Sequence, residues 1–128
     1  MAVRQFDAEQ VRIGSSVYVL WTVTEEFIVS DETQFLALDG MELDVALNRR
    51  MFMSFAAAVS GCAVQWWVAN NPDFSDEYLF WTVNPAVGVP DVSTYDSIGE
   101  GRYWRFKAKK AVAGADSQLS IAFLMQAY

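Results

Sequence analysis

Three pairs of adjacent carboxylates and one thiol are the groups in this sequence that could do chemistry. They are Glu25-Glu26, Asp31-Glu32, Asp76-Glu77 and Cys62. Two carboxylates can hydrolyse a glycoside when the fold holds them at a fixed separation. Neighbouring residues of a strand point to opposite faces, so we interpret each pair as solvated loop acids. A glycosidase built from two distant acids stays open, because that chemistry depends only on geometry.

Other residue types that support catalysis are scarce. The chain has no histidine, which removes the commonest general base and metal ligand. A single cysteine forms no intrachain disulfide or thiolate zinc site, and Cys62 follows a glycine on an apolar face, which favours a buried, inert thiol. The spacing of Asp91, Asp96 and Glu100 matches no ligand pattern. We therefore predict no catalytic residue, no metal and no cofactor, and a protein that is not an enzyme.

Basic residues gather near the end of the sequence. Residues 101–128 contain five of the nine basic residues and only one of the 16 acidic residues. Alternation along a strand places Arg105, Lys107 and Lys109 on one face. The other face, which we expect to enter the core, carries Trp104, Phe106 and Ala108. Two interpretations stay open: a solvated strand face that uses lysine for solubility, or a cationic stripe that meets an acidic surface of a neighbouring subunit or partner.

Aromatic residues make up 15% of the chain, more than a core of this size absorbs. By alternation, Trp67, Tyr78 and Phe80 lie opposite residues assigned to the core. This surplus of apolar surface, expected near residues 78–83 and 86–101, predicts burial by another copy of the chain, with a trimer as the expected homo-oligomer. The alternative is that these face assignments fail in a tightly curved barrel.

Apolar and polar side chains alternate strictly through most of the sequence, which predicts that strands position these residues. The expected strands cover residues 17–29, 34–38, 41–47, 51–59, 62–68, 78–83, 102–112 and 117–128. Asp39-Gly40 predicts a hairpin between the second and third of these, and residues 86–101 are expected to form one long loop. The whole chain, residues 1–128, is predicted to be one all-β domain, an antiparallel β-sandwich or jelly roll of about eight strands.

One segment fits two secondary structures. Between residues 41 and 59, Leu43, Leu47, Met51 and Phe55 follow each other at helical spacing, and three consecutive alanines favour a helix. The Asp-Gly turn before this segment favours strands instead. We expect strands and keep the helix as the alternative.

Residues 51–69 carry no charge and end near two tryptophans, as a membrane span does. The segment contains no Leu or Ile and includes Ser54, Ser60, Gly61 and Gln65, so we expect no membrane partner. No apolar run at the first residues resembles a signal peptide, so synthesis in a reducing cytoplasm is expected. A net charge of −7 argues against nucleic acid as a partner.

The second half of the sequence resembles a known class of module. Its strands are Ala63–Ala69, followed by Asn70-Asn71-Pro72-Asp73, then Tyr103–Lys107, and finally Ser120–Leu124. Together they resemble the jelly-roll modules of bacteriophage virion accessory proteins, such as capsid cement (decoration) proteins and tail-associated proteins. The resemblance implies a structural virion protein that oligomerises and contacts others such as the major capsid protein. The same layout also resembles β-sandwich carbohydrate-binding modules, in which exposed Trp and Tyr stack on sugars.

Overall fold

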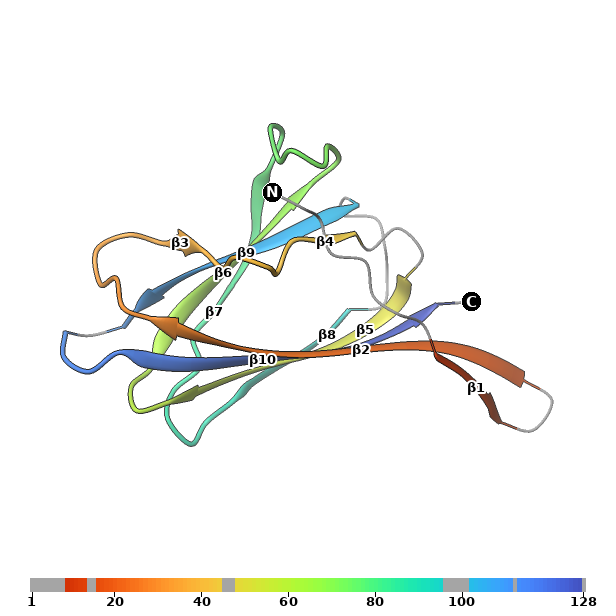
Figure 1. Ribbon diagram of the computed structural model, residues 1–128, viewed down its shortest axis with the longest axis horizontal. Helices are drawn as coiled ribbons and strands as arrows, with labels where there is room; N and C mark the ends of the chain where they lie inside the picture. Colours follow the sequence, from red (N-terminus) through yellow and green to blue (C-terminus); the bar gives the residue numbers. More distant parts are fainter. Residues whose placement is uncertain (1–8, 14–15, 45–47, 96–101, 112, 128) are drawn as a thin grey trace.

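The chain forms two antiparallel β-sheets that pack face to face in a computed structural model (Figure 1). The structure describes residues 9–13, 16–44, 48–95, 102–111 and 113–127. The β2 sheet has the order β1-β2-β10-β5-β8, with bounds Glu9–Ile13, Ser16–Val29, Ser117–Ala127, Asn48–Ala58 and Asp91–Tyr95. The β9 sheet has the order β3-β9-β6-β7, with bounds Leu36–Ala37, Tyr103–Lys110, Cys62–Ala69 and Tyr78–Val83, and β4 (Leu43–Asp44) also pairs with β9. The all-β sandwich predicted from alternation is confirmed.

The core lies between the two sheets and follows the alternation of their strands. Every second residue of β6 and β9 is buried, and the same holds for the described side chains of β5 and for Leu119 and Ile121 of β10. The Phe55 and Phe106 rings join the two sheets, with their centres 5.8 Å apart. Trp66 and Trp104 pack edge to face across β6 and β9, with ring centres 4.4 Å apart. Burial of such large rings supplies most of the stabilisation available to a domain of this size.

The segment with two possible secondary structures is extended. Residues 43–44 and 48–58 are strands β4 and β5, so the helix alternative is wrong for them, and residues 45–47 lie outside the described residues. The apolar residues of β5 alternate between the core and the outer face, and pairing with β10 on one side and β8 on the other fixes the extended backbone. Among the described residues, no helix is long and apolar enough to cross a membrane.

The predicted hairpin at Asp39-Gly40 is wrong, although a turn does form there. Gly40 has a φ of 84°, which suits glycine, and the Met41 N–H donates to the Leu38 carbonyl at 3.3 Å. The flanking strands β3 and β4 do not pair with each other, because both pair with β9 and run along it in the same direction. The turn therefore interrupts one edge strand along β9 and divides it into β3 and β4. It also buries Glu42, which is only 1% exposed.

The long loop predicted for residues 86–101 is wrong in its middle. Residues 91–95 form strand β8, which pairs with β5 at the edge of the β2 sheet, and residues 96–101 lie outside the described residues. Gly88 and Pro90, residue types that favour loops, come just before this strand. The five residues of β8 gain a strand partner only through a pairing that is distant in sequence.

Strand β7 carries an extra residue relative to β6. Trp66 pairs with Trp81 and Trp67 pairs with Leu79, which leaves Phe80 as a bulge. The bulge lets Phe80 pack against Trp66, with ring centres 4.6 Å apart. The prediction that Phe80 points away from the core is therefore wrong. Tyr78 lies opposite the buried Val68 and shares the core-facing side of the strand, although it is exposed at the strand's start.

Candidate functional site

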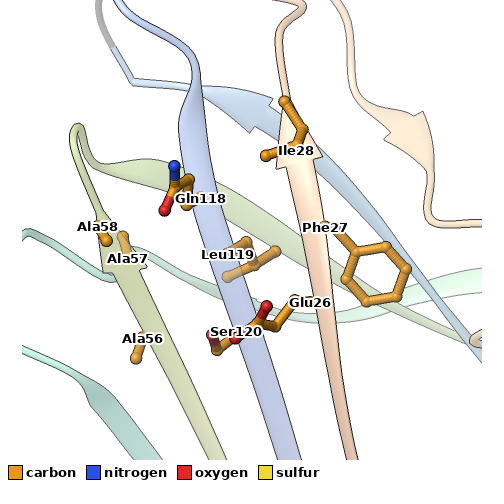
Figure 2. A pocket seen from close by; sticks show the side chains of 9 residues that line it. All are labelled: Glu26, Phe27, Ile28, Ala56, Ala57, Ala58, Gln118, Leu119 and Ser120. Atoms are coloured by element: carbon orange, nitrogen blue, oxygen red, sulfur yellow. The ribbon is translucent and has the colours of Figure 1, made fainter.

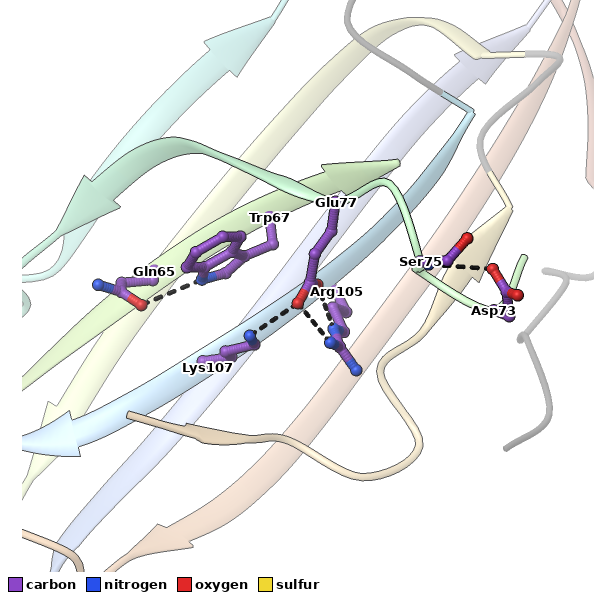
Figure 3. A network of polar contacts seen from close by, with 7 residues as sticks. All are labelled: Gln65, Trp67, Asp73, Ser75, Glu77, Arg105 and Lys107. Carbon is purple, nitrogen blue, oxygen red and sulfur yellow. Dashed lines mark hydrogen bonds and ion pairs between the residues drawn. The ribbon is translucent and has the colours of Figure 1, made fainter. Parts of the chain in front are cut away.

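The outer face of the β9 sheet holds a compact ion-pair network around Glu77 (Figure 3). Arg105 donates to the two carboxylate oxygens of Glu77 through Nε and Nη2, at 2.6 and 2.5 Å, and Lys107 donates through Nζ at 2.9 Å. The three side chains are only 16–20% exposed. Burial acts to raise the pKa of Glu77, but the hydrogen bonds from Arg105 and Lys107 outweigh it and lower that pKa. The network fixes the start of β7 against β9.

Each outward cation of β9 lies over an aromatic ring. The Arg105 guanidinium is 4.8 Å from the centre of the Phe74 ring, and the Lys109 ammonium is 4.7 Å from that of Phe35. Lys107 lies over Trp67, whose Nε1 donates to Gln65 at 3.0 Å (Figure 3). Cations over ring faces are attracted by the ring quadrupole, and their alkyl stems cover apolar surface. Part of the surplus aromatic surface is thus covered within the chain.

The turn between β6 and β7 is held by its own carboxylates. Asp76 accepts the backbone N–H groups of Asn70 and Asn71, both at 3.1 Å. Burial acts to raise the pKa of Asp76, and these backbone hydrogen bonds lower it overall. Asp73 accepts the Ser75 N–H at 3.0 Å, which lowers the pKa of Asp73 (Figure 3). The turn therefore holds Glu77 in place for the two cations of β9.

Another predicted carboxylate pair has a comparable local role. Asp31 accepts the backbone N–H groups of Gln34 and Thr33, both at 2.8 Å, and these bonds lower its pKa. Cys62 is buried, and burial raises the pKa of its thiol, which confirms the prediction that the thiol is buried. Within the described ranges, no group of three potential ligand residues could hold a metal ion.

The residues predicted to form an interface have different environments. Arg105 and Lys107 are paired with Glu77 within the chain, whereas Lys109 has no carboxylate partner among the described residues. Trp67 is half-buried. Tyr78 is exposed at the sheet edge, and Phe80 packs against the core. Contact of these six residues with another chain stays a prediction.

A more exposed apolar surface lies at the side of the sandwich where both sheets end, on β7, β8 and their connection. We call it the open edge. It contains six of the nine large hydrophobic residues exposed in the described part of the chain: Tyr78, Leu79, Trp81, Val87, Val89 and Val92. All six lie within residues 78–83 or 86–101, where the surplus apolar surface was predicted, and residues 78–90 contain no charged residue in a chain with 20% charged residues.

The outer face of the β2 sheet has a hollow of about 410 Å³ (Figure 2). It spans three adjacent strands: Glu26 and Ile28 come from β2, Gln118 and Ser120 from β10, and Ala56 and Ala58 from β5. The intervening Phe27, Ala57 and Leu119 turn toward the core. The hollow exists because its floor is made of alanine and serine, whose short side chains leave the sheet surface uncovered between the larger residues at its rim.

No protein-family model matches the chain, and no curated protein matches it. A structure from work describing Bacillus endospore appendages as a novel family of disulfide-linked pili has a TM-score of 0.49 and 7% identity, covering 100% of this chain and 98% of that one. The SPBc2 prophage-derived protein YomS has a TM-score of 0.44 and 9% identity, covering 80% and 94%. PirA has a TM-score of 0.39 and 7% identity, covering 89% and 98%. All three scores are below 0.5.

Proposed function

We propose that this protein is a non-enzymatic structural subunit that assembles with copies of itself on a bacteriophage virion, as a capsid cement (decoration) protein or a tail-associated protein. The open edge is the observation that carries the proposal. Soluble monomers seldom expose large contiguous apolar surface, and such surface marks a contact with another molecule. The expected partners are further copies, in a trimer, and other virion proteins such as the major capsid protein.

The order of the strands supports the proposal. If β3 and β4 are counted as one broken strand and β1 is set aside, eight strands remain in two sheets, in the order β2-β10-β5-β8 and β3/β4-β9-β6-β7. We infer that this arrangement is a jelly roll, because consecutive strands such as β4 and β5, or β8 and β9, belong to opposite sheets. Jelly rolls occur in viral capsid domains and also in lectins and cupins, so the fold alone does not select the function.

The roles of the carboxylates also support a structural subunit. Asp31, Asp73 and Asp76 accept hydrogen bonds from their own turns, and Glu77 holds two cations of β9. These contacts require ionised carboxylates that stiffen the loops, whereas a general acid in a glycosidase requires a raised pKa. Three of the six residues in the predicted pairs thus have a stated structural task.

Light scattering of the purified protein at micromolar concentration tests self-assembly. We expect a multimer, with a trimer of 14.4 kDa chains as the specific expectation. A monomer at all concentrations would contradict the proposal. It would favour the carbohydrate-binding alternative, because Trp81 would then be an exposed ring without a protein partner, and binding to a glycan array would test that alternative.

A further inference from the structure

Trp81 is the most exposed aromatic side chain at the open edge, at 60%. It lies opposite Trp66 in the register of β6 and β7, and no described strand covers its other side, because β7 is the last strand of the β9 sheet. Three other tryptophans differ: Trp66 and Trp104 are buried, and Trp67 lies under Lys107. Tryptophan is among the residues most enriched at the energetic centres of protein interfaces.

The hollow on the β2 sheet has the size and chemistry to receive such a ring. Its volume of about 410 Å³ falls within the roughly 300–1,000 Å³ of sites that bind small molecules. Its floor of Ala56, Ala58 and Ser120 presents small side chains, and the exposed Ile28 forms an apolar rim. Glu26 and Gln118 add carboxylate and amide oxygens, which are acceptors that an indole N–H requires when it is buried.

We propose that Trp81 of one copy of this chain occupies the hollow formed by β2, β10 and β5 of a second copy. The inference rests on the proposed self-assembly and specifies its contact. Residues 78–90 carry no charge, although each chain has a net charge of −7. This segment can therefore approach a second copy without repulsion between its own acidic side chains and those of the other chain.

The area required for a stable contact explains why the open edge is larger than Trp81. A standard interface buries about 800 Å² on each partner, and one tryptophan supplies about 150–250 Å². The exposed Val87, Val89 and Val92 lie on the β7–β8 connection and on β8, and they add apolar surface to the open edge. Because the ring and the hollow lie on different parts of one chain, the contact joins unlike surfaces. Such a contact can close into a ring of subunits, which is compatible with a trimer.

Two variants that remove opposite halves of the contact provide the test. Trp81→Ala removes the ring and keeps the hollow, whereas Ser120→Phe fills the hollow and keeps the ring. Each variant alone is expected to associate at least tenfold more weakly than wild type in light scattering. An equimolar mixture is expected to form one-to-one heterodimers, because the intact ring of one variant fits the intact hollow of the other and no further contact is left to extend the assembly.

Matched controls separate this contact from general effects on the fold. Leu36→Ala removes another exposed hydrophobic residue, and Ala63→Phe adds the same bulk to the outer face of the β9 sheet; both are expected to assemble like wild type. Thermal unfolding checks that all four variants fold. If wild type assembles and Trp81→Ala or Ser120→Phe assembles equally well, the contact is wrong and the proposed function stands. Failure of the mixture to form heterodimers also overturns the contact, whereas a monomeric wild type overturns the proposed function itself.

Discussion

The ammonium of Lys107 lies 4.2 Å from the centre of the Trp67 ring and at the same time donates to Glu77 at 2.9 Å. One cation therefore covers an aromatic ring and neutralises a carboxylate. The register explains how: Gln65 lies opposite Lys107 and Trp67 lies opposite Arg105, so the ring and the two cations occupy neighbouring positions on one face. The aromatic surface in this part of the sheet is covered by side chains of the same chain, whereas the hydrophobic residues of the open edge stay exposed.

The ion-pair network is expected to stabilise the fold measurably. Glu77→Gln removes the negative charge from between two half-buried cations, so we expect a loss of about 1–2 kcal/mol in the free energy of unfolding. Urea unfolding measures this change. Glu32→Gln is the matched control, because Glu32 is exposed, and it should alter stability by less than about 0.5 kcal/mol. Equal effects of the two substitutions would contradict a stabilising role for Glu77.

Stability should fall in acid. The folded state lowers the pKa of Glu77 below its ordinary value of 4.5 and that of Asp31 below 3.8. A lowered pKa means that the unfolded chain binds more protons in this range, so the stabilisation is complete above about pH 4.5 and is lost as the pH falls through the folded-state pKa values. Urea midpoints from pH 7 to pH 3 should decrease below that point. The difference between wild type and Glu77→Gln should shrink over the same range, and a constant difference would count against this assignment.

The contact between the sheets depends on Phe106. This ring is fully buried and packs against Phe55 and Trp66, so Phe106→Ala should reduce stability by about 3–5 kcal/mol. Phe106→Leu keeps most of the volume and should cost less. Chemical unfolding compares the two variants, and a cost near zero for Phe106→Ala would show that the core is packed differently.

The thiol of Cys62 should be protected in the folded protein. Burial raises its pKa, so both access and thiolate formation are reduced. A colorimetric thiol reagent at pH 8 should react slowly with the native protein and rapidly in denaturant. Ala111→Cys provides an exposed thiol for comparison in a chain that also carries Cys62→Ser. Equal rates for native and denatured wild type would contradict the burial of Cys62.

Local patterns predicted the strands better than their connections. Alternation identified β6 and β9 and the inward positions of Trp104 and Phe106, because burial on one face leaves a direct mark on the sequence. The turn at Gly40 was also predicted, but its role was not, since β3 and β4 find their partner in the distant β9. The bulge at Phe80 shifted a face assignment by one residue, and a shift of this kind has no local signature.

The candidate site was predicted only in part, for a similar reason. The sequence placed Arg105, Lys107 and Lys109 on one face, which the alternation of β9 confirms. It could not pair Arg105 and Lys107 with Glu77, because a sequence separation of 28 positions between Glu77 and Arg105 says nothing of their distance in space. The hollow was also beyond prediction, since it arises from small residues on two strands, β5 and β10, that meet only in the sheet.

The central position of β10 has a consequence for how the chain acquires its structure. β10 lies between β2 and β5, yet it follows both in the sequence by several strands. During synthesis, β2 and β5 leave the ribosome long before the strand that joins them, so their facing edges stay unpaired until residues 117–127 emerge. Long-range pairing of this kind folds slowly, and unpaired edges favour aggregation. A nascent chain stalled before residue 117 should therefore need a chaperone to stay in solution.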